Sequence, residues 1–372
     1  MLKETAPGER RVAMVPKALD MVKKTGAEVW IERGAGLDAG FSDAEFEAKG
    51  ARLASAADVR QNTQVILQVR VNGGSGLNGN HTVIGFCDPL GEPAEAAAFA
   101  QSGAALISVE MIPRITRAQS MDALSSMASI AGYKAVILAA ESLPRMFPMM
   151  MTAAGTIPAA RVLILGAGVA GLQAIATARR LGAVVLGYDV RSSVKEQIES
   201  LGARFLNIDL GTSGEGEGGY AKALGEDVIR RQREQMAAAL KEQDVVITTA
   251  AVPGRKAPIL ITREMARGMA PGSVIVDIAA ERGGNCELTR AGETVIDGGV
   301  SILGPVNIPS SVPYHASMMY ARNLATLLKH LTKDGKLNID MNDEITRETL
   351  IARQGKVVHP KVQALLGPAV GA

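Results

Sequence analysis

Cysteine is nearly absent from the sequence, because Cys87 and Cys286 are the two cysteines among 372 residues. They form neither a disulfide framework nor a metal-ligand cluster, and they fit a reducing compartment. An excess of charge is also lacking, since the formal net charge is +2, which argues against a nucleic-acid-binding surface. No stretch approaches the roughly 18 uncharged apolar residues that cross a bilayer, and the charged N-terminus lacks a secretory apolar core. These absences predict a soluble chain.

Aromatic residues are scarce as well, at 3% of the chain, whereas methionine is frequent with 16 residues. A core with few rings is built from small and flexible side chains, and methionine fills irregular gaps in such a core. The run from Met146 to Met151 precedes an apolar strand pattern. We therefore interpret it as core or interface filler in preference to a functional cluster.

Strand-like and helical patterns alternate from the start of the chain, which predicts an α/β fold, and the length suits two domains. We expect two Rossmann-like, doubly wound parallel-sheet domains separated by a cleft. One domain comprises residues 1–125 with 310–372, a connecting helix covers 126–144, and the second domain comprises 145–309. The last helical pattern, at 316–333, has no strand partner of its own. It is expected to return to the first domain or to cover the interface.

The expected strands are short apolar runs bounded by turn residues. Those of the first domain lie near residues 28–31, 65–71, 81–86 and 104–108. Those of the second domain lie near residues 162–165, 184–188, 204–207, 245–248, 274–277 and 302–303.

Residues 162–191 carry a dinucleotide-binding pattern. An apolar run ends in Gly166-x-Gly168-x-x-Gly171, a helical pattern follows, and a second apolar run ends at Asp189. The glycines permit a tight turn, a close approach of the backbone to a pyrophosphate, and close helix–strand packing. The helix N-terminus suits the diphosphate, and Asp189 would accept the ribose hydroxyls while repelling a 2′-phosphate. The pattern predicts NAD over NADP, against the alternative of an ordinary glycine turn.

Two loops could carry further chemistry. Residues 113–126 supply guanidinium, carboxamide, carboxylate and hydroxyl groups that could hold a nicotinamide and its ribose. Their composition fits an N-capped helix start with solvated charges equally well. Residues 211–220 are rich in glycine, and their composition favours a flexible linker over a lid in which Tyr220 contacts the cofactor.

Two strand ends in the second domain are further candidates. Ala250 follows a strand, where its backbone could line the cofactor site, although a plain tight turn is equally sensible. Asn285 could serve the nicotinamide end, whereas Cys286 is interpreted as a buried packing thiol. An amino-acid dehydrogenase would also need a lysine or histidine as general acid/base. His81 starts a strand after a loop and is interpreted as solvated.

The segments RITRAQSMDALSS, AGYKAV, FPMMMTAAGT, ARVLILGAGVAGLQAIATARRLGA, GGYAK, ITTA and GGNC carry a family resemblance. Over roughly residues 2–360 the chain is similar to the NAD(H)-binding component of proton-translocating NAD(P) transhydrogenases, in the split bacterial form whose α subunit lacks membrane helices. Alanine dehydrogenases share this fold and carry a catalytic lysine and histidine in the first domain. The matching segments here, at 68–70 and 87–88, contain neither, so the resemblance argues against amino-acid oxidation.

The resemblance also implies roles for individual residues. It implies that Gln119 bridges toward the NADP ribose on a partner, and that Tyr220 belongs to a mobile loop closing on the nucleotide. The residues implied in catalysis are Arg114, Gln119, Asp122, Ser125 and Tyr220. The residues implied in cofactor binding are Arg114, Ile115, Thr116, Arg117, Gln119, Asp122, Ser125, Gly166, Gly168, Val169, Gly171, Asp189, Val190, Arg191, Gly219, Tyr220 and Ala250. No metal site is expected.

The activity implied is direct hydride transfer from NADH on this chain to NADP⁺ held by a partner β subunit, which needs no acid/base residue. Further implied partners are a second copy of the chain and a membrane-spanning second part of the α subunit. Through them the chain would lie on the cytoplasmic face of the bacterial inner membrane. The alternatives are a soluble alanine or imino-acid dehydrogenase and an NAD-sensing module without turnover.

Two segments depart from the family pattern. The family begins with a short strand before its Pro-Lys-Glu, whereas this sequence begins Met1-Leu2-Lys3-Glu4. Either that strand is missing or the start is assigned late. Residues 72–80 also lack the usual proline-containing turn. Both departures affect the edge of the first domain and leave the cofactor motifs intact.

Overall fold

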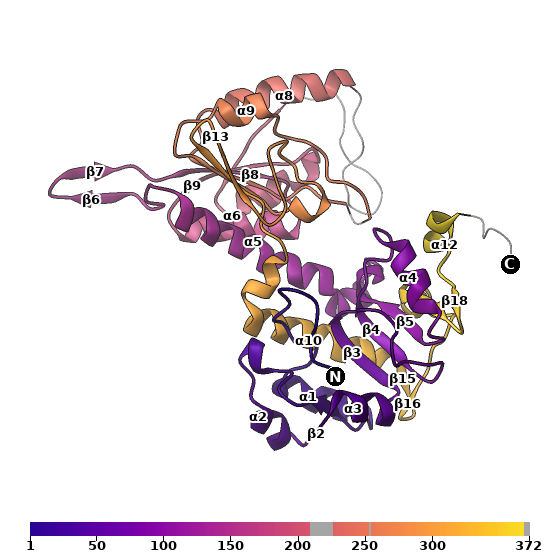
Figure 1. The fold of residues 1–372 in the computed structure, drawn as a ribbon. Coiled ribbons are helices and arrows are strands. Elements are labelled where there is room, and N and C mark those ends of the chain that lie inside the picture. Colours follow the sequence, from indigo (N-terminus) through magenta and orange to yellow (C-terminus); the bar gives the residue numbers. More distant parts are fainter. Residues whose placement is uncertain (209–225, 253, 368–372) are drawn as a thin grey trace. The chain divides into compact units, whose positions relative to one another are not determined.

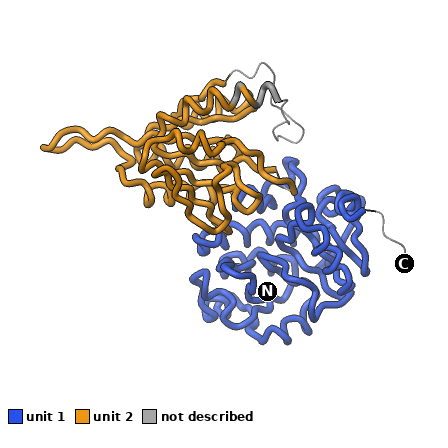
Figure 2. Tube along the Cα trace, turned by 45° about the horizontal axis from the view of Figure 1, so that its top comes forward, with its two compact units in different colours: residues 1–127, 309–372 blue, residues 128–308 orange. Residues whose placement is uncertain are grey.

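The protein is represented by a computed structural model that describes residues 1–208, 226–252 and 254–367. The chain divides into two compact units (Figure 2). Unit 1 comprises Met1–Met127 with Pro309–Ala372, and unit 2 comprises Ala128–Ile308. Both units contain a parallel-rich sheet covered by helices, so the predicted α/β fold class is confirmed.

Unit 2 contains a seven-stranded sheet in the order β10-β9-β8-β11-β12-β14-β13. Its strand order reverses between β8 and β11, which is where ligands bind in doubly wound sheets. The pairs are parallel except for the antiparallel pair β13–β14. The sequence patterns missed edge strand β13. The strands are β8 Arg161–Leu165, β9 Val184–Tyr188, β10 Arg204–Phe205, β11 Val245–Thr248, β12 Val274–Asp277, β13 Thr294–Asp297 and β14 Val300–Leu303.

Helices cover both faces of this sheet, because side chains on a strand alternate between faces. Val162 and Ile164 of β8 point into a core shared with α5, α6 and α7. Leu163 and Leu165 point into a second core, shared with α8 and α9. The strand is therefore apolar throughout, as a buried parallel strand must be. The helices are α5 Ala123–Ser142, α6 Val169–Arg180, α7 Lys195–Ser200, α8 Glu226–Leu240 and α9 Arg263–Arg267.

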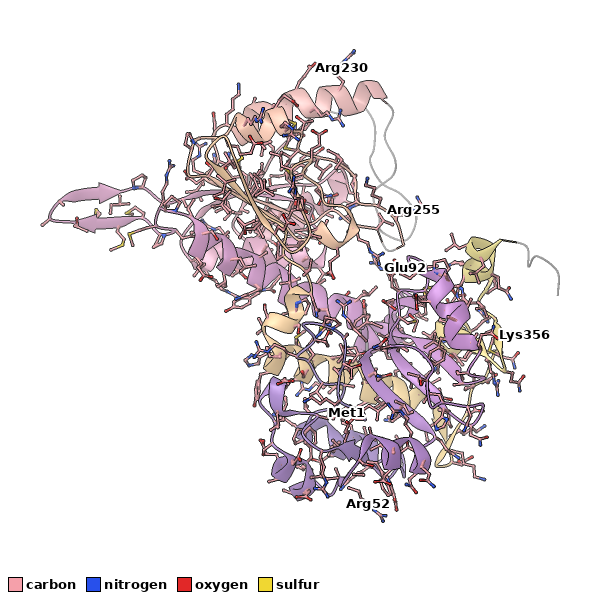
Figure 3. The ribbon with its side chains drawn as sticks, viewed as in Figure 1. Met1, Arg52, Glu92, Arg230, Arg255 and Lys356 are labelled. Carbon is pink, nitrogen blue, oxygen red and sulfur yellow. The ribbon has the colours of Figure 1, made fainter. Side chains whose placement is uncertain are left out.

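A hairpin extends away from the rest of unit 2 (Figure 1). Its strands are β6 Met150–Thr152 and β7 Gly155–Ile157, which pair antiparallel. The side chains of Met149 and Met151 are 55% and 78% exposed. The core alternative for this methionine run is therefore wrong for these residues, and the interface alternative stays a prediction; Figure 3 shows the hairpin side chains projecting from the unit.

Helix α5 is, among the described residues, the one helix long and apolar enough to cross a membrane by length and composition. It contains Lys134 and Glu141, so it is not a run of uncharged apolar residues. Core helices of water-soluble proteins have the same length and composition. Here Ala135 and Ala139 belong to the core of unit 2. A Cβ added at Gly132 would lie 2.1 Å from the carbonyl oxygen of Ala170, so α5 packs closely on the first turn of α6.

Unit 1 contains a five-stranded sheet in the order β18-β17-β5-β4-β3. The strands β3 Val65–Arg70, β4 Thr82–Phe86 and β5 Ala105–Ser108 are parallel. The C-terminal segment adds β17 Leu350–Arg353 and β18 Lys356–Val357 in antiparallel orientation. The sequence patterns give the helix at 316–333 no strand partner and do not place these two strands. Two smaller sheets pair β1 Trp30–Glu32 with β2 Arg52–Ala54, and β15 Thr332–Lys333 with β16 Lys336–Leu337.

Helix α10, Pro313–His330, returns to unit 1 and packs behind its sheet. Its buried Tyr320 stacks on Phe86 of β4 and donates a hydrogen bond to the carbonyl oxygen of Gln68 over 2.8 Å. The helix thereby closes a core that the N-terminal sequence cannot complete alone. The remaining helices of unit 1 are α1 Leu19–Lys23, α2 Asp43–Ala48, α3 Ala56–Asn62, α4 Pro93–Ala100, α11 Glu344–Thr349 and α12 Pro360–Leu366.

Two local expectations about unit 1 are also resolved. His81 is buried, since its exposed fraction is 7%. Its ring accepts a hydrogen bond from the N–H of Asn78 and lies 2.9 Å from the carbonyl oxygen of Arg60. The interpretation of His81 as solvated was wrong. Residues 1–15 form no strand, although Met1 exchanges backbone hydrogen bonds with β1.

Candidate functional site

The glycine turn joins β8 to α6 in unit 2, and its three glycines meet different constraints. Gly166 has a φ of +99°, which favours glycine, and an added Cβ would lie 2.5 Å from Thr249 Oγ1. An added Cβ at Gly171 would lie 1.8 Å from the carbonyl oxygen of Gly166. At Gly168 it would meet nothing within 4 Å. Two glycines therefore serve the architecture of the turn, whereas Gly168 borders open space.

The open space at Gly168 lies at the N-terminus of α6. Gly168 is the N-cap residue and, as a glycine, has no side chain to cap the helix. The first N–H groups of a helix have no partner within it and carry the positive end of the helix dipole. Val169 is 43% exposed, which leaves an apolar surface next to these donors. The arrangement fits a diphosphate, and Gly168 and Val169 are the residues that would hold it.

Asp189 lies directly after β9, where the sequence places it, and its carboxylate is fully engaged. Oδ2 accepts hydrogen bonds from the Ala167 N–H and the Arg191 guanidinium, both over 2.8 Å. Oδ1 accepts from the Arg191 N–H over 2.9 Å and from its Nε over 2.8 Å. Burial alone would raise the pKa of Asp189, but these hydrogen bonds lower it below its usual value. Ribose hydroxyls would have to compete with Arg191 for this carboxylate.

The strand end at Ala250 is held by a buried amide. Asn285 Oδ1 accepts from the Ala250 N–H over 3.0 Å, and Nδ2 donates to the carbonyl oxygens of Ala250 and Pro258, both over 2.8 Å. Asp277 in turn accepts from the Asn285 N–H over 2.6 Å. The interpretation of Asn285 as a nicotinamide ligand is not supported, because its amide is used inside unit 2. Any contact of Ala250 with a nucleotide would be made without its N–H.

The predicted nicotinamide loop lies in unit 1 and forms a 3-10 helix, η4, over Thr116–Met121. Arg114 and Gln119 are exposed on it. Asp122 follows and starts α5, where its carboxylate accepts from the Ser125 N–H over 2.9 Å and from the Ser125 hydroxyl over 2.6 Å. The alternative of an N-capped helix start is thus realised by Asp122 and Ser125. Arg114, Arg117 and Gln119 are the longer polar side chains that the loop presents to solvent, where a ligand could meet them.

The structure places the remaining candidates as follows. Thr116 and Arg117 are exposed, Ile115 and Val190 are half-buried, and Gly219 and Tyr220 lie outside the described residues. The nicotinamide-loop candidates belong to unit 1 and the pyrophosphate and adenosine candidates to unit 2. Sequence reasoning missed Asp343, which forms an ion pair with Arg117 over 2.7 Å. The pattern Asp343-x-x-Thr346 signals a helix start, but nothing local indicates the partner Arg117.

Groups in unit 1 that could have suggested other chemistry have structural partners. Burial raises the pKa of the Cys87 thiol well above its usual value, which disfavours the reactive thiolate. Glu110 is half-buried, and its carboxylate accepts hydrogen bonds from the N–H groups of Cys87 and Asp88 and from the Ser108 hydroxyl. Among the described residues no group of three or more His, Cys, Asp or Glu side chains could hold a metal ion.

Two family models match the chain and together cover most of it. The alanine dehydrogenase/PNT N-terminal domain matches residues 1–131, and the alanine dehydrogenase/PNT C-terminal domain matches residues 135–360. The chain belongs to the alanine dehydrogenase/PNT family. The nucleotide turn, Asp189 and Ala250 lie in the region matched by the C-terminal model, and η4 lies in the region matched by the N-terminal model.

Individual relatives narrow the family further. One relative is the first part of the NAD(P) transhydrogenase α subunit of Rhodospirillum rubrum. The chain is 44% identical to it over 371 residues, which cover 96% of this chain and 97% of the relative. The solved transhydrogenase structure from Sinorhizobium meliloti has a TM-score of 0.84 and 44% identity, covering 97% of this chain and 99% of that one. An L-alanine dehydrogenase structure shares the fold, with a TM-score of 0.84 at 24% identity and 98% coverage of both chains.

These similarities confirm the resemblance inferred from the RITRAQSMDALSS and GAGVAG motifs. Within the alanine dehydrogenase/PNT family the chain is a homologue of transhydrogenase α subunits, and it is an oxidoreductase with an NAD-binding dehydrogenase-like domain. The relatives are named as parts of a multi-subunit enzyme, which implies partner subunits.

Proposed function

We propose that this chain binds NAD(H) and transfers a hydride directly between it and NADP(H) held on a partner subunit, in the direction NADH to NADP⁺. The observation that carries the proposal is the loop 113–126, which contains η4 and presents Arg114 and Gln119 at the surface of unit 1. Residues 113–126 include neither histidine nor lysine. A hydride that passes between two nicotinamides moves no substrate proton, so no acid/base residue is required.

The bound dinucleotide supplies the hydride, and the protein supplies binding and orientation. Gly168 and the α6 N-terminus would hold the pyrophosphate, and Asp189 the adenosine ribose. Arg114, Asp122 and Ser125 would orient the nicotinamide and its ribose, with Gln119 facing the second nucleotide. Tyr220 and Gly219 keep the roles that the resemblance implies. Holding the reacting carbons about 3–3.5 Å apart is the step at which positioning accelerates the reaction.

The partners belong to the same proposal. An NADP-binding β subunit would meet η4, and a membrane-spanning portion of the α subunit would couple transfer to proton movement. This places the chain on the cytoplasmic face of the bacterial inner membrane. We further propose a homodimer, supported by the β6–β7 hairpin, because exposed methionines on a projecting hairpin are better explained by burial against a second copy.

The test combines the purified chain with an NADP-binding transhydrogenase domain and follows NADPH formation from NADH. We expect transfer only when both components are present. Alanine with NAD⁺, run in parallel, should give no NADH. Turnover of alanine by the chain alone would favour the dehydrogenase alternative, and NADH binding without transfer in any mixture would favour a sensing module.

A further inference from the structure

The period of η4 sorts its residues onto three faces, because a 3-10 helix has about three residues per turn. Ala118 and Met121 share one face and are buried in unit 1. Arg117 and Ser120 share a second face. Gln119 lies on the third face, which is exposed. Arg117 and Ser120, on either side of Gln119, are both bonded to the C-terminal segment of the chain, Arg117 through its side chain and Ser120 through its backbone carbonyl.

Arg117 is bonded to Asp343, 226 residues later in the sequence. Its Nη1 donates to Asp343 Oδ2 over 2.7 Å. The other carboxylate oxygen accepts from the Thr346 N–H over 2.9 Å and lies 2.8 Å from His330 Nε2. Residues of α10 and α11 therefore hold the Asp343 carboxylate in place, independently of its bond to Arg117. Burial opposes ionisation, but the hydrogen bonds lower the pKa of Asp343 well below its usual value, so it is charged at neutral pH.

Ser120 is bonded to Asn323, which lies on α10. Asn323 Nδ2 donates to the carbonyl oxygen of Ser120 over 2.9 Å. The asparagine is 6% exposed, and its Oδ1 has no hydrogen-bond partner among the described residues. Burying a polar amide costs free energy that hydrogen bonds must offset. The bond to Ser120 is the hydrogen bond that offsets this cost for Asn323.

We propose that Asp343 and Asn323 are positioning residues for Gln119, and that Arg117 ties the loop down instead of contacting nucleotide. The inference rests on the proposed function, because it takes Gln119 as the group that orients the two nicotinamides. The two bonds reach the second residue before Gln119 and the first residue after it. They restrain the backbone on both sides of Gln119, while Asp343 and Asn323 touch neither nucleotide. Losing either bond should therefore slow transfer at unchanged NADH affinity.

Two near-isosteric variants each remove one of these bonds. Asp343→Asn keeps the Oδ1 that caps α11, since asparagine and aspartate are equally good N-cap residues, but it sets an amide donor against the Arg117 guanidinium. Asn323→Leu keeps a similar volume and deletes the donor to Ser120. The matched control is Asp297→Asn, which removes an arginine–carboxylate pair in unit 2.

Three measurements are made on the full chain: amide hydrogen exchange of residues 112–124, NADH affinity by calorimetry, and hydride transfer to NADP⁺ on an NADP-binding transhydrogenase domain. We expect both variants to exchange faster in 112–124 alone and to transfer roughly three- to tenfold more slowly. NADH affinity should stay within about twofold. In an Arg117→Gln background, Asp343→Asn should slow hydride transfer no further, because the two side chains form one ion pair. Asp297→Asn should match the wild type in every measurement.

Wild-type exchange or wild-type transfer in both variants would overturn the inference. Faster exchange throughout unit 1 would overturn it too, because the residues would then stabilise the unit in general. Gln119→Ala separates this failure from that of the proposed function. If Gln119→Ala is slow while the two variants are normal, the positioning role alone is wrong. If Gln119→Ala transfers normally, the assigned role of the loop fails and the positioning role fails with it.

Discussion

Alanine at Gly168 should abolish much of the NADH affinity and leave the fold intact. The backbone at Gly168 has φ −77° and ψ −169°, an extended conformation that alanine adopts without strain. The new methyl meets no protein atom within 4 Å, so unit 2 need not adjust. Removing a glycine stabilises the fold by about 0.4–1 kcal/mol through the unfolded state, whereas alanine is a poorer N-cap than glycine by about 1 kcal/mol, so the two effects oppose each other. The melting temperature should move by no more than about 4 °C.

The effect on binding follows from where the methyl points. It occupies the open space at the α6 N-terminus, where the diphosphate would accept hydrogen bonds from the first N–H groups. Hydrogen bonds to charged groups contribute about 1.5–3 kcal/mol each. Losing one raises the dissociation constant for NADH by about tenfold or more. Titration calorimetry with NADH measures this constant, and differential scanning calorimetry measures the melting temperature on the same sample.

Gly171→Ala is the matched control, three residues along the same turn. Its methyl would lie 1.8 Å from the Gly166 carbonyl oxygen, so α6 must move away from β8. Overpacking against backbone costs about 3 kcal/mol or more, which lowers the melting temperature by roughly 6–12 °C in a unit of this size. Wild-type NADH affinity in Gly168→Ala would refute the placement of the diphosphate. A large loss of stability in Gly168→Ala would refute the geometry of the turn.

Three further predictions concern single side chains. Asp189→Asn should narrow the difference in calorimetric affinity between NADH and NADPH by about tenfold or more, since Arg191 loses its carboxylate and can pair with a 2′-phosphate; an unchanged ratio would show that Asp189 does not select the cofactor. Gln119→Asn should slow transfer at least about tenfold with NADH affinity unchanged, and normal turnover would make Gln119 a plain loop residue. Burial raises the pKa of Glu4 to about 7 from 4.5, so the folded state retains its proton in that window and stability falls as the pH rises through it. Glu4→Gln should remove this pH-dependent contribution to stability. The measurement is the melting temperature of both proteins as a function of pH, and the same pH dependence in both would contradict the prediction.

The nucleotide turn was predictable from sequence because its constraints are local. The tight turn, the close packing of helix on strand and the acid after the next strand all fall within residues 162–191. The strand β9 was placed at its observed bounds, because a buried parallel strand is a continuous apolar run. The helix predicted over 126–144 appears as α5, Ala123–Ser142, which begins three residues earlier and ends two residues before Pro144.

The features that sequence missed depend on partners far along the chain. Strand β17 pairs with β5, and Asp343 pairs with Arg117, at separations for which one sequence carries no signal. For the methionine run the sequence left core and interface open, because apolar composition does not say whether the covering surface belongs to the same chain. Asn285 was misread because a buried amide that binds backbone has the same composition as one that binds a ligand.

Unit 1 is built from both ends of the chain, and this fixes the order in which the enzyme can be assembled during synthesis. Unit 2 is continuous and complete once residue 308 has emerged. Until β17, Leu350–Arg353, has emerged, β5 presents an open sheet edge. Asn323 and Asp343 also emerge only after unit 2 is complete, so the loop that carries Gln119 is restrained late in synthesis. A chain that stops short of Asp343 would keep its nucleotide turn and lose the ion pair that restrains its loop. If the chain transfers hydride as proposed, we expect rapid transfer only from molecules synthesised beyond Asp343.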